Sequence, residues 1–196
     1  MQVSLVFPPS WMPSQPFLSL PSLQGFLKNK GVENVSIRDL NIETMDALLS
    51  AEKVRQTHAI IDERLNEGTG PIRSEENPEE VHSRLSWARE VIERENMVQN
   101  VEWAKSTLKS QGFYEIDDYV ECWKIIDRWL QAFGMLYYPS EISIADNSMR
   151  YSVYSSEDVL KAVNNNNENP YHDLFNEHII DSMIQEGADL VGISVT

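Results

Sequence analysis

Three short apolar runs stand out from a chain whose other apolar positions recur mostly at helical spacing. They span residues 2–9, 34–39 and 188–196. Each run is rich in β-branched residues and too short for a helix, which is typical of a strand. Pro8 and Pro9 end the first run, because proline lacks the amide proton that ladder pairing needs. We therefore predict three β-strands.

Helical sequence joins these strands. Residues 18–30 repeat leucine on one face and end at Gly31, and the helical pattern that begins at Pro170 ends at Gly187. Glycine is the usual residue just past a helix. Strands joined by such crossovers run parallel. The sequence therefore predicts an α/β fold whose parallel sheet has at least three strands, with the first strand in the middle.

The segment between the second and third strands is far longer than a crossover of about a dozen to thirty residues. Its strongest helical pattern is an apolar stripe over residues 117–133, where we expect Trp123 and Trp129 to pack in a core. We therefore expect three parts: residues 1–42 as the first βαβ part of the sheet, residues 43–187 as an all-helical insertion, and residues 188–196 as the third strand.

Composition limits the possible functions. The formal charge of -15 disfavours binding to nucleic acid or to anionic membranes. The single cysteine, Cys122, can build neither a disulfide framework nor a cysteine-based metal or iron–sulfur site. His172 and His178 are six residues apart and so point to different faces of a predicted helix, and His58 and His82 stand alone, so we predict no metal site. The sequence shows no secretion signal and no membrane span. We expect a cytoplasmic protein without nucleic-acid or membrane partners.

The carboxyl ends of the strands are the candidate ligand site, because open parallel sheets bind ligands there. No glycine-rich phosphate loop follows the first strand, and no Gly-x-Ser-x-Gly motif is present. Trp11 lies in the proline-rich loop after Pro9, where it must either cover a neighbour or face a ligand. Asp39 ends the second strand, a position where such sheets often carry an acid that binds a ribose hydroxyl. An acid there more often caps a turn or a helix.

Four pieces of the chain, in this order, resemble the amino-terminal half of the cobalamin-binding domain of cobalamin-dependent radical SAM enzymes. They are VSLVFPP at 3–9, the helix at 18–31, VSIRDLN at 35–41 and ADLVGISVT at 188–196. The resemblance covers only the two ends of the chain. It implies a Rossmann-like (flavodoxin-like) sheet of strand order 2-1-3-4-5 with cobalamin across the carboxyl ends, of which this chain holds the strands 2-1-3.

The resemblance also implies which residues face the cofactor. The family generally lacks the Asp-x-His-x-x-Gly motif that supplies a cobalt ligand elsewhere, and so does this chain. The positions that match the family's cofactor-facing segments are Pro8, Pro9, Ser10, Ser194, Val195 and Thr196, with Trp11 as a candidate lid. Asp39 joins these cofactor-binding candidates through its place at a strand end. No catalytic residue is assigned.

Three features depart from the family. The helical insertion is longer than usual, no Cys-x-x-x-Cys-x-x-Cys motif is present, and the sequence stops at the third strand, which leaves a sheet edge open. We therefore expect a fragment that is not catalytic by itself. The iron–sulfur cluster and S-adenosylmethionine would bind in a carboxy-terminal part of the same polypeptide. The expected partners of this fragment are cobalamin and that carboxy-terminal part.

A second interpretation stays open. The chain would then be a noncatalytic α/β module whose helical insertion binds a protein or peptide partner. A flavodoxin-like receiver domain is a third possibility, which the absence of paired acids after the first strand disfavours.

Overall fold

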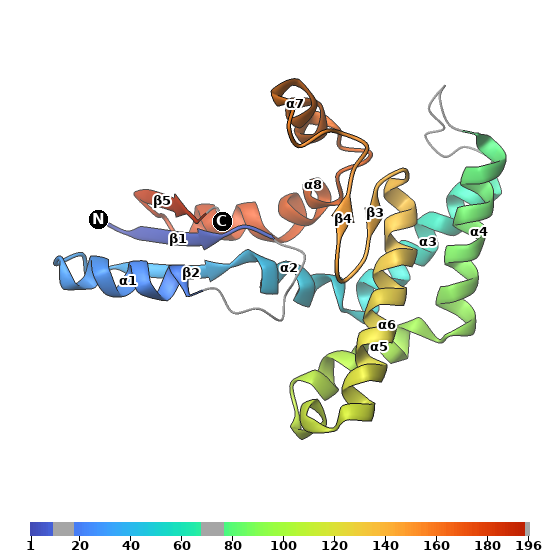
Figure 1. Cartoon of the computed structure of the whole chain (residues 1–196), viewed down its shortest axis with the longest axis horizontal. Coiled ribbons are helices and arrows are strands. Elements are labelled where there is room, and N and C mark those ends of the chain that lie inside the picture. The colour runs from blue at the N-terminus through green and yellow to red at the C-terminus, as the bar shows by residue number, and fades with distance from the viewer. Residues whose placement is uncertain (10–17, 68–76, 195–196) are drawn as a thin grey trace. The chain divides into compact units, whose positions relative to one another are not determined.

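The computed structural model describes residues 1–9, 18–67 and 77–194, and it folds as two units (Figure 1). The sheet unit comprises Met1–Ala47 and Tyr171–Thr196, and the helical unit comprises Leu48–Pro170. Buried hydrophobic side chains form a core in each unit. Within the described ranges, no helix is both long enough and apolar enough to cross a membrane.

The sheet unit contains the three predicted strands, β1 (Val3–Phe7), β2 (Val35–Asp39) and β5 (Leu190–Ile193). They pair in parallel in the order β2-β1-β5, so β1 is the middle strand (Figure 1). Every residue of β1 is buried, as a strand covered on both faces requires. The predicted α/β fold with strand order 2-1-3 is confirmed.

Helical segments pack on both faces of the sheet. Successive side chains of β1 point to opposite faces, so adjacent residues of this strand join different cores. On one face, Leu5 packs in a core with Leu20 of α1 (Ser19–Asn29). On the other, Val6 packs with Leu40, the first residue of α2 (Leu40–Leu48), and with Ile179. Ile179 ends the π-helical turn η3 (Phe175–Ile179), which joins α8 (Pro170–Leu174) to α9 (Ile180–Gln185).

Two glycines follow the helices that lead into β2 and β5, as the sequence predicts. Gly31 after α1 has a φ of 85°, and Gly187 after α9 has a φ of 62°. Both values lie in the left-handed region, where a side chain would be strained, so glycine suits the reversal from helix to strand.

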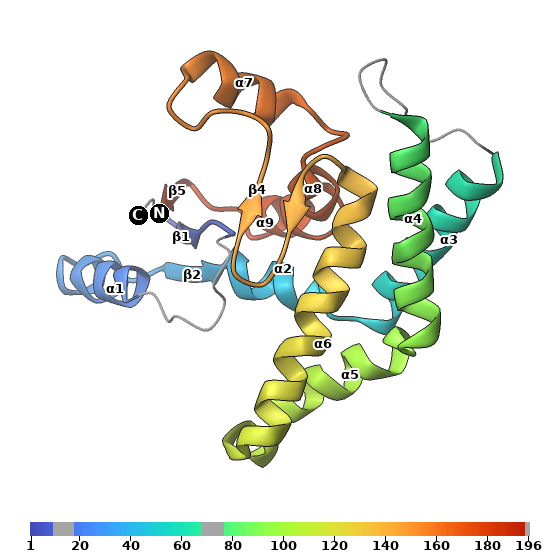
Figure 2. The ribbon, with the colours of Figure 1, turned by 45° about the vertical axis from the view of Figure 1, so that its right-hand side comes forward.

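The helical unit is built on α3 (Ala51–Glu67), α4 (Pro78–Arg94), α5 (Met97–Leu108) and α6 (Ile116–Gly134), which pack against one another (Figure 2). The 3₁₀ turns η1 (Gln111–Tyr114) and η2 (Met135–Tyr137) flank α6. Trp129 of α6 is fully buried, as expected, and its Nε1–H donates to the carbonyl oxygen of Leu48 at 3.0 Å. Trp123 lies nearer the start of α6 and is only partly buried.

The structure differs from the sequence prediction in the extent and content of the insertion. The last helix, expected within residues 43–187, packs on the sheet through Ile179, and the helical unit covers the shorter range Leu48–Pro170. This unit is also not all helical. An antiparallel pair, β3 (Glu141–Ile142) and β4 (Asn147–Ser148), follows η2 and precedes α7 (Ser156–Asn164).

Candidate functional site

The carboxyl ends of the three parallel strands form one rim of the sheet. Phe7, the last residue of β1, lies opposite Asp39, the last residue of β2. On the other side of β1, Val6 lies opposite Ile193, and the next residue, Ser194, donates its backbone N–H to the Val6 carbonyl at 2.9 Å. The strand ends that the sequence predicted to lie together therefore do so.

The middle strand β1 is a topological switch point. The helix α1, which leads from β1 to β2, packs on one face of the sheet, and the helical segment that leads into β5 packs on the other. Connections that pack on opposite faces mark the position beside β1 where open α/β sheets bind ligands. Pro8 and Ser194 border this position.

The described rim residues next to β1 and β5 are prolines and serines. Pro8 and Pro9 are half-buried and follow β1 directly. The Ser194 hydroxyl donates to the hydroxyl of Ser19, the first residue of α1, at 3.0 Å. This contact links the end of β5 to the start of α1 and sets two hydroxyl groups at the rim. Ser19 was not among the predicted site residues, since nothing in its local sequence marks it.

Asp39 is at the rim, but its carboxylate is engaged in capping. Its Oδ1 accepts from the backbone N–H groups of Asn41 and Ile42, both at 3.1 Å. These amides belong to the first turn of α2, so Asp39 satisfies donors that the helix itself cannot. Capping of α2 therefore accounts for an acid at this position, and no ligand is needed to explain it.

The remaining predicted site residues, Ser10, Trp11, Val195 and Thr196, lie outside the described residues.

A polar network on one face of the sheet was not predicted. Arg38 of β2 donates through Nε to Glu43 at 3.1 Å and through Nη1 to the Ser182 hydroxyl at 2.8 Å, and Nη1 also lies 3.4 Å from Glu186. The hydrogen bond to Glu43 is the main cause that raises the pKa of Arg38, and burial opposes it. The network fixes β2 against α2 and α9 and leaves Arg38 as a structural cation.

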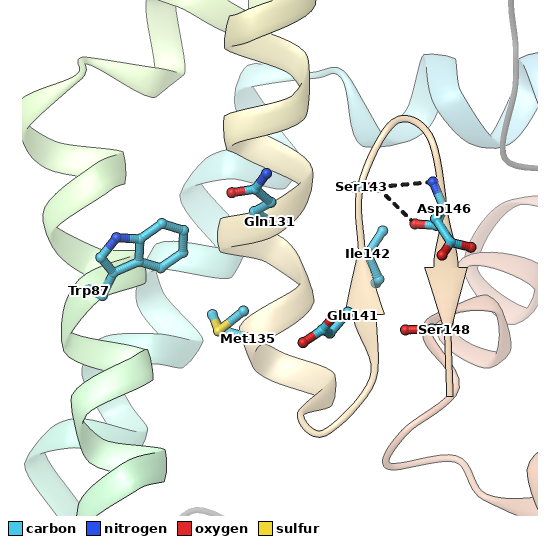
Figure 3. A pocket seen from close by; sticks show the side chains of 8 residues that line it. All are labelled: Trp87, Gln131, Met135, Glu141, Ile142, Ser143, Asp146 and Ser148. Atoms are coloured by element: carbon cyan, nitrogen blue, oxygen red, sulfur yellow. Dashed lines mark hydrogen bonds between the residues drawn. The ribbon is translucent and has the colours of Figure 1, made fainter. Parts of the chain in front are cut away.

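The helical unit contains a separate pocket of about 290 Å³ between α4, α6 and the β3–β4 hairpin (Figure 3). Trp87, Met135 and Ile142 supply its apolar wall. Gln131, Ser143, Ser148 and the two acids Glu141 and Asp146 supply its polar lining. The sequence did not predict this pocket, because strands of two residues carry no periodic signal.

A second unpredicted cluster joins α3 to α4. His58 Nδ1 lies 3.4 Å from Asp62, and Nε2 lies 3.0 Å from Glu93. One ligand atom from each residue lies within 4.8 Å of the others, which is close enough for a shared metal ion. The imidazole already bridges the two carboxylates, however, and Arg89 lies 3.7 Å from Asp62. His58 is therefore not isolated, and its imidazole links Asp62 of α3 to Glu93 of α4.

The fold and the rim define an α/β protein with an open parallel sheet, and the sequence has no glycine-rich loop after its middle strand. No family model, curated protein or solved structure matches this chain.

Proposed function

We propose that this chain is the cobalamin-binding segment of a cobalamin-dependent radical SAM enzyme, with the corrin over the rim between β1 and β5. One observation carries the proposal. The three pieces that resemble strands of that family pair in parallel with the first in the middle, so their carboxyl ends share one rim. Such a rim at a switch point is where open α/β sheets bind cofactors.

The chemistry of the described rim residues fits a corrin. Cobalamin presents a broad apolar macrocycle fringed by amide groups. Pro8 and Pro9 offer apolar rings to the macrocycle. Proline has no backbone N–H, so an apolar corrin face over these residues would leave no amide donor without a partner. The hydroxyls of Ser19 and Ser194 both donate and accept, so they suit the amide fringe. When bound, cobalamin supplies a cobalt ion that can carry a methyl group.

In this proposal the chain binds the corrin and does not complete the reaction by itself. An iron–sulfur cluster of this class needs three cysteines, and the sequence has one, Cys122, which is buried in the helical unit. The cluster and S-adenosylmethionine would therefore bind on other parts of the enzyme. We place the protein in the cytoplasm, and its single free, buried thiol is in keeping with a reducing compartment.

Equilibrium dialysis against hydroxocobalamin tests the proposal. Ser194→Phe places a bulky ring at the rim, and we expect it to lower corrin affinity about tenfold or more by obstruction of the site. Ser83→Phe makes the same change at an exposed position of α4 and should bind like wild type. Equal retention by both variants would exclude the rim as the site, and thermal melts of each variant establish that it is folded.

A further inference from the structure

We propose that the pocket between α4, α6 and the β3–β4 hairpin binds an arginine side chain from a basic peptide segment of a partner protein. This second site lies wholly in the helical unit and does not depend on cobalamin binding.

The pocket is held in shape by its own hydrogen bonds. Ser143 Oγ accepts from the backbone N–H of Asp146 at 2.9 Å and donates to the Asp146 carbonyl at 3.0 Å, which fixes the hairpin turn (Figure 3). Asp127 of α6 accepts from the backbone N–H of Ile144 at 3.1 Å and from the Gln131 amide at 2.7 Å. The hairpin is therefore tied to α6, and little reorganisation is needed before a ligand binds.

A close approach of backbone to backbone also holds the hairpin on α6. A Cβ atom added at Gly134 would lie 3.3 Å from both the backbone nitrogen and the Cβ of Ile142. Glycine at the end of α6 therefore lets Ile142 pack down onto the helix, where it is buried and forms part of the apolar wall.

The charges of the lining select a cation. Glu141 and Asp146 line the pocket, and none of its lining residues is lysine or arginine. Both acids are exposed, and among the residues that the structure describes neither carboxylate has an ion pair. The aromatic wall residue Trp87 has the Arg128 guanidinium 4.8 Å from its ring centroid, and Arg128 is neutralised by Glu95 at 3.1 Å. The overall charge of -15 further attracts a basic partner.

The size and walls of the pocket favour arginine. A volume of about 290 Å³ is at the small end of ligand pockets and suits one long side chain better than a cofactor. Trp87, Met135 and Ile142 suit an aliphatic stem, and the five N–H donors of a guanidinium suit a polar lining that includes Glu141, Asp146 and Gln131. Arginine also stacks on indole and pairs with carboxylates more specifically than lysine does.

Fluorescence polarisation with two labelled pentapeptides tests this inference. The probe is fluorescein-Gly-Gly-Arg-Gly-Gly, and its partner carries citrulline, which has nearly the same shape without the charge. We expect the arginine peptide to bind about tenfold or more tightly than the citrulline peptide, because charge-assisted hydrogen bonds are lost. Equal binding of the two peptides, or no binding of either at millimolar concentration, would overturn the proposal.

A matched pair of double variants separates the pocket from the net charge. Glu141→Gln with Asp146→Asn removes both pocket carboxylates and should weaken the arginine peptide about tenfold or more. Glu115→Gln with Asp117→Asn removes two exposed acids at the start of α6 and should leave affinity within about twofold, as expected for distant, screened charges. Equal losses in the two double variants would show that general attraction, and not this pocket, binds the peptide. Both variants keep side-chain shape, and circular dichroism establishes their folding.

Discussion

The hydroxyl of Ser194, just past β5, donates a hydrogen bond to the hydroxyl of Ser19, the first residue of α1, across 3.0 Å. The two residues are far apart in the sequence, and their contact links the outer strand of the sheet to the helix that follows its middle strand. Together with the parallel pairing of β5 with β1, it joins the two ends of the chain in one unit at the proposed corrin rim.

This contact predicts an energetic coupling between the two serines. Ser19→Ala and Ser194→Ala should each lower the free energy of unfolding by about 0.5–1 kcal/mol, the usual net value of such a bond. Because either change removes the same bond, the double variant should cost less than the sum of the two. Urea unfolding of the four proteins measures the coupling, and strictly additive losses would show that the hydroxyls do not interact.

Substitutions of Asp39 distinguish an acid that caps a helix from an acid that binds a ligand. Asp39→Ala removes the acceptor for two amides of α2 and should destabilise the protein by about 1 kcal/mol, whereas Asp39→Asn keeps an oxygen acceptor and should cost less. Thermal unfolding of the two variants provides the measurement. An asparagine variant that is as unstable as the alanine variant would argue against the cap and for a role that needs the charge.

Trp129 should be the most sensitive aromatic residue of the helical unit. Trp129→Phe leaves a cavity and removes the donor to the Leu48 carbonyl, so we expect a loss of about 2–3 kcal/mol in unfolding free energy. Trp103→Phe is the matched control, because Trp103 is 40% exposed and should change stability by less than about 0.5 kcal/mol. Similar losses at both positions in urea unfolding would contradict the core assignment.

The Cys122 thiol should be unreactive until the helical unit opens. Burial is the main cause that raises the pKa of Cys122, and Asp118 adds to the shift. Since the reactive form is the thiolate, a raised pKa in a fully buried site leaves little of it near neutral pH. Ellman's reagent should therefore label Cys122 slowly in native buffer and at once in urea.

The same shift has a consequence for stability at high pH. Because the pKa of Cys122 is higher in the folded than in the unfolded chain, its contribution to stability is complete below the ordinary thiol pKa and is lost as the pH rises through the folded value. Cys122→Ala should remove this part of the alkaline loss and all labelling. Rapid labelling of the native protein would show that the thiol is accessible.

The sheet was predictable from the sequence because its signals are local. The strand residues of β1 and β2 form short apolar runs, proline and glycine mark the ends of these elements, and the parallel direction follows from the helical connections. The core that the last helix joins could not be predicted in this way. Ile179 packs on Val6 of β1, and helical periodicity does not reveal that partner.

The unpredicted sites share a physical reason, since each is assembled from separate elements. Asp62 follows His58 at helical spacing and could have been noticed, but Glu93 comes from α4. The pocket is formed by Trp87 of α4, by part of α6, and by a hairpin whose strands are two residues long. The lone Asp39 was ambiguous in the sequence, and only the amides of α2 identify it as a cap.

The retention of hydroxocobalamin by the wild-type chain in equilibrium dialysis tests the central claim most directly. We predict saturable binding that reaches one corrin per chain and is weakened by Ser194→Phe. Retention that never exceeds that of a buffer compartment without protein would contradict the assignment of the rim of β1 and β5 as a corrin site.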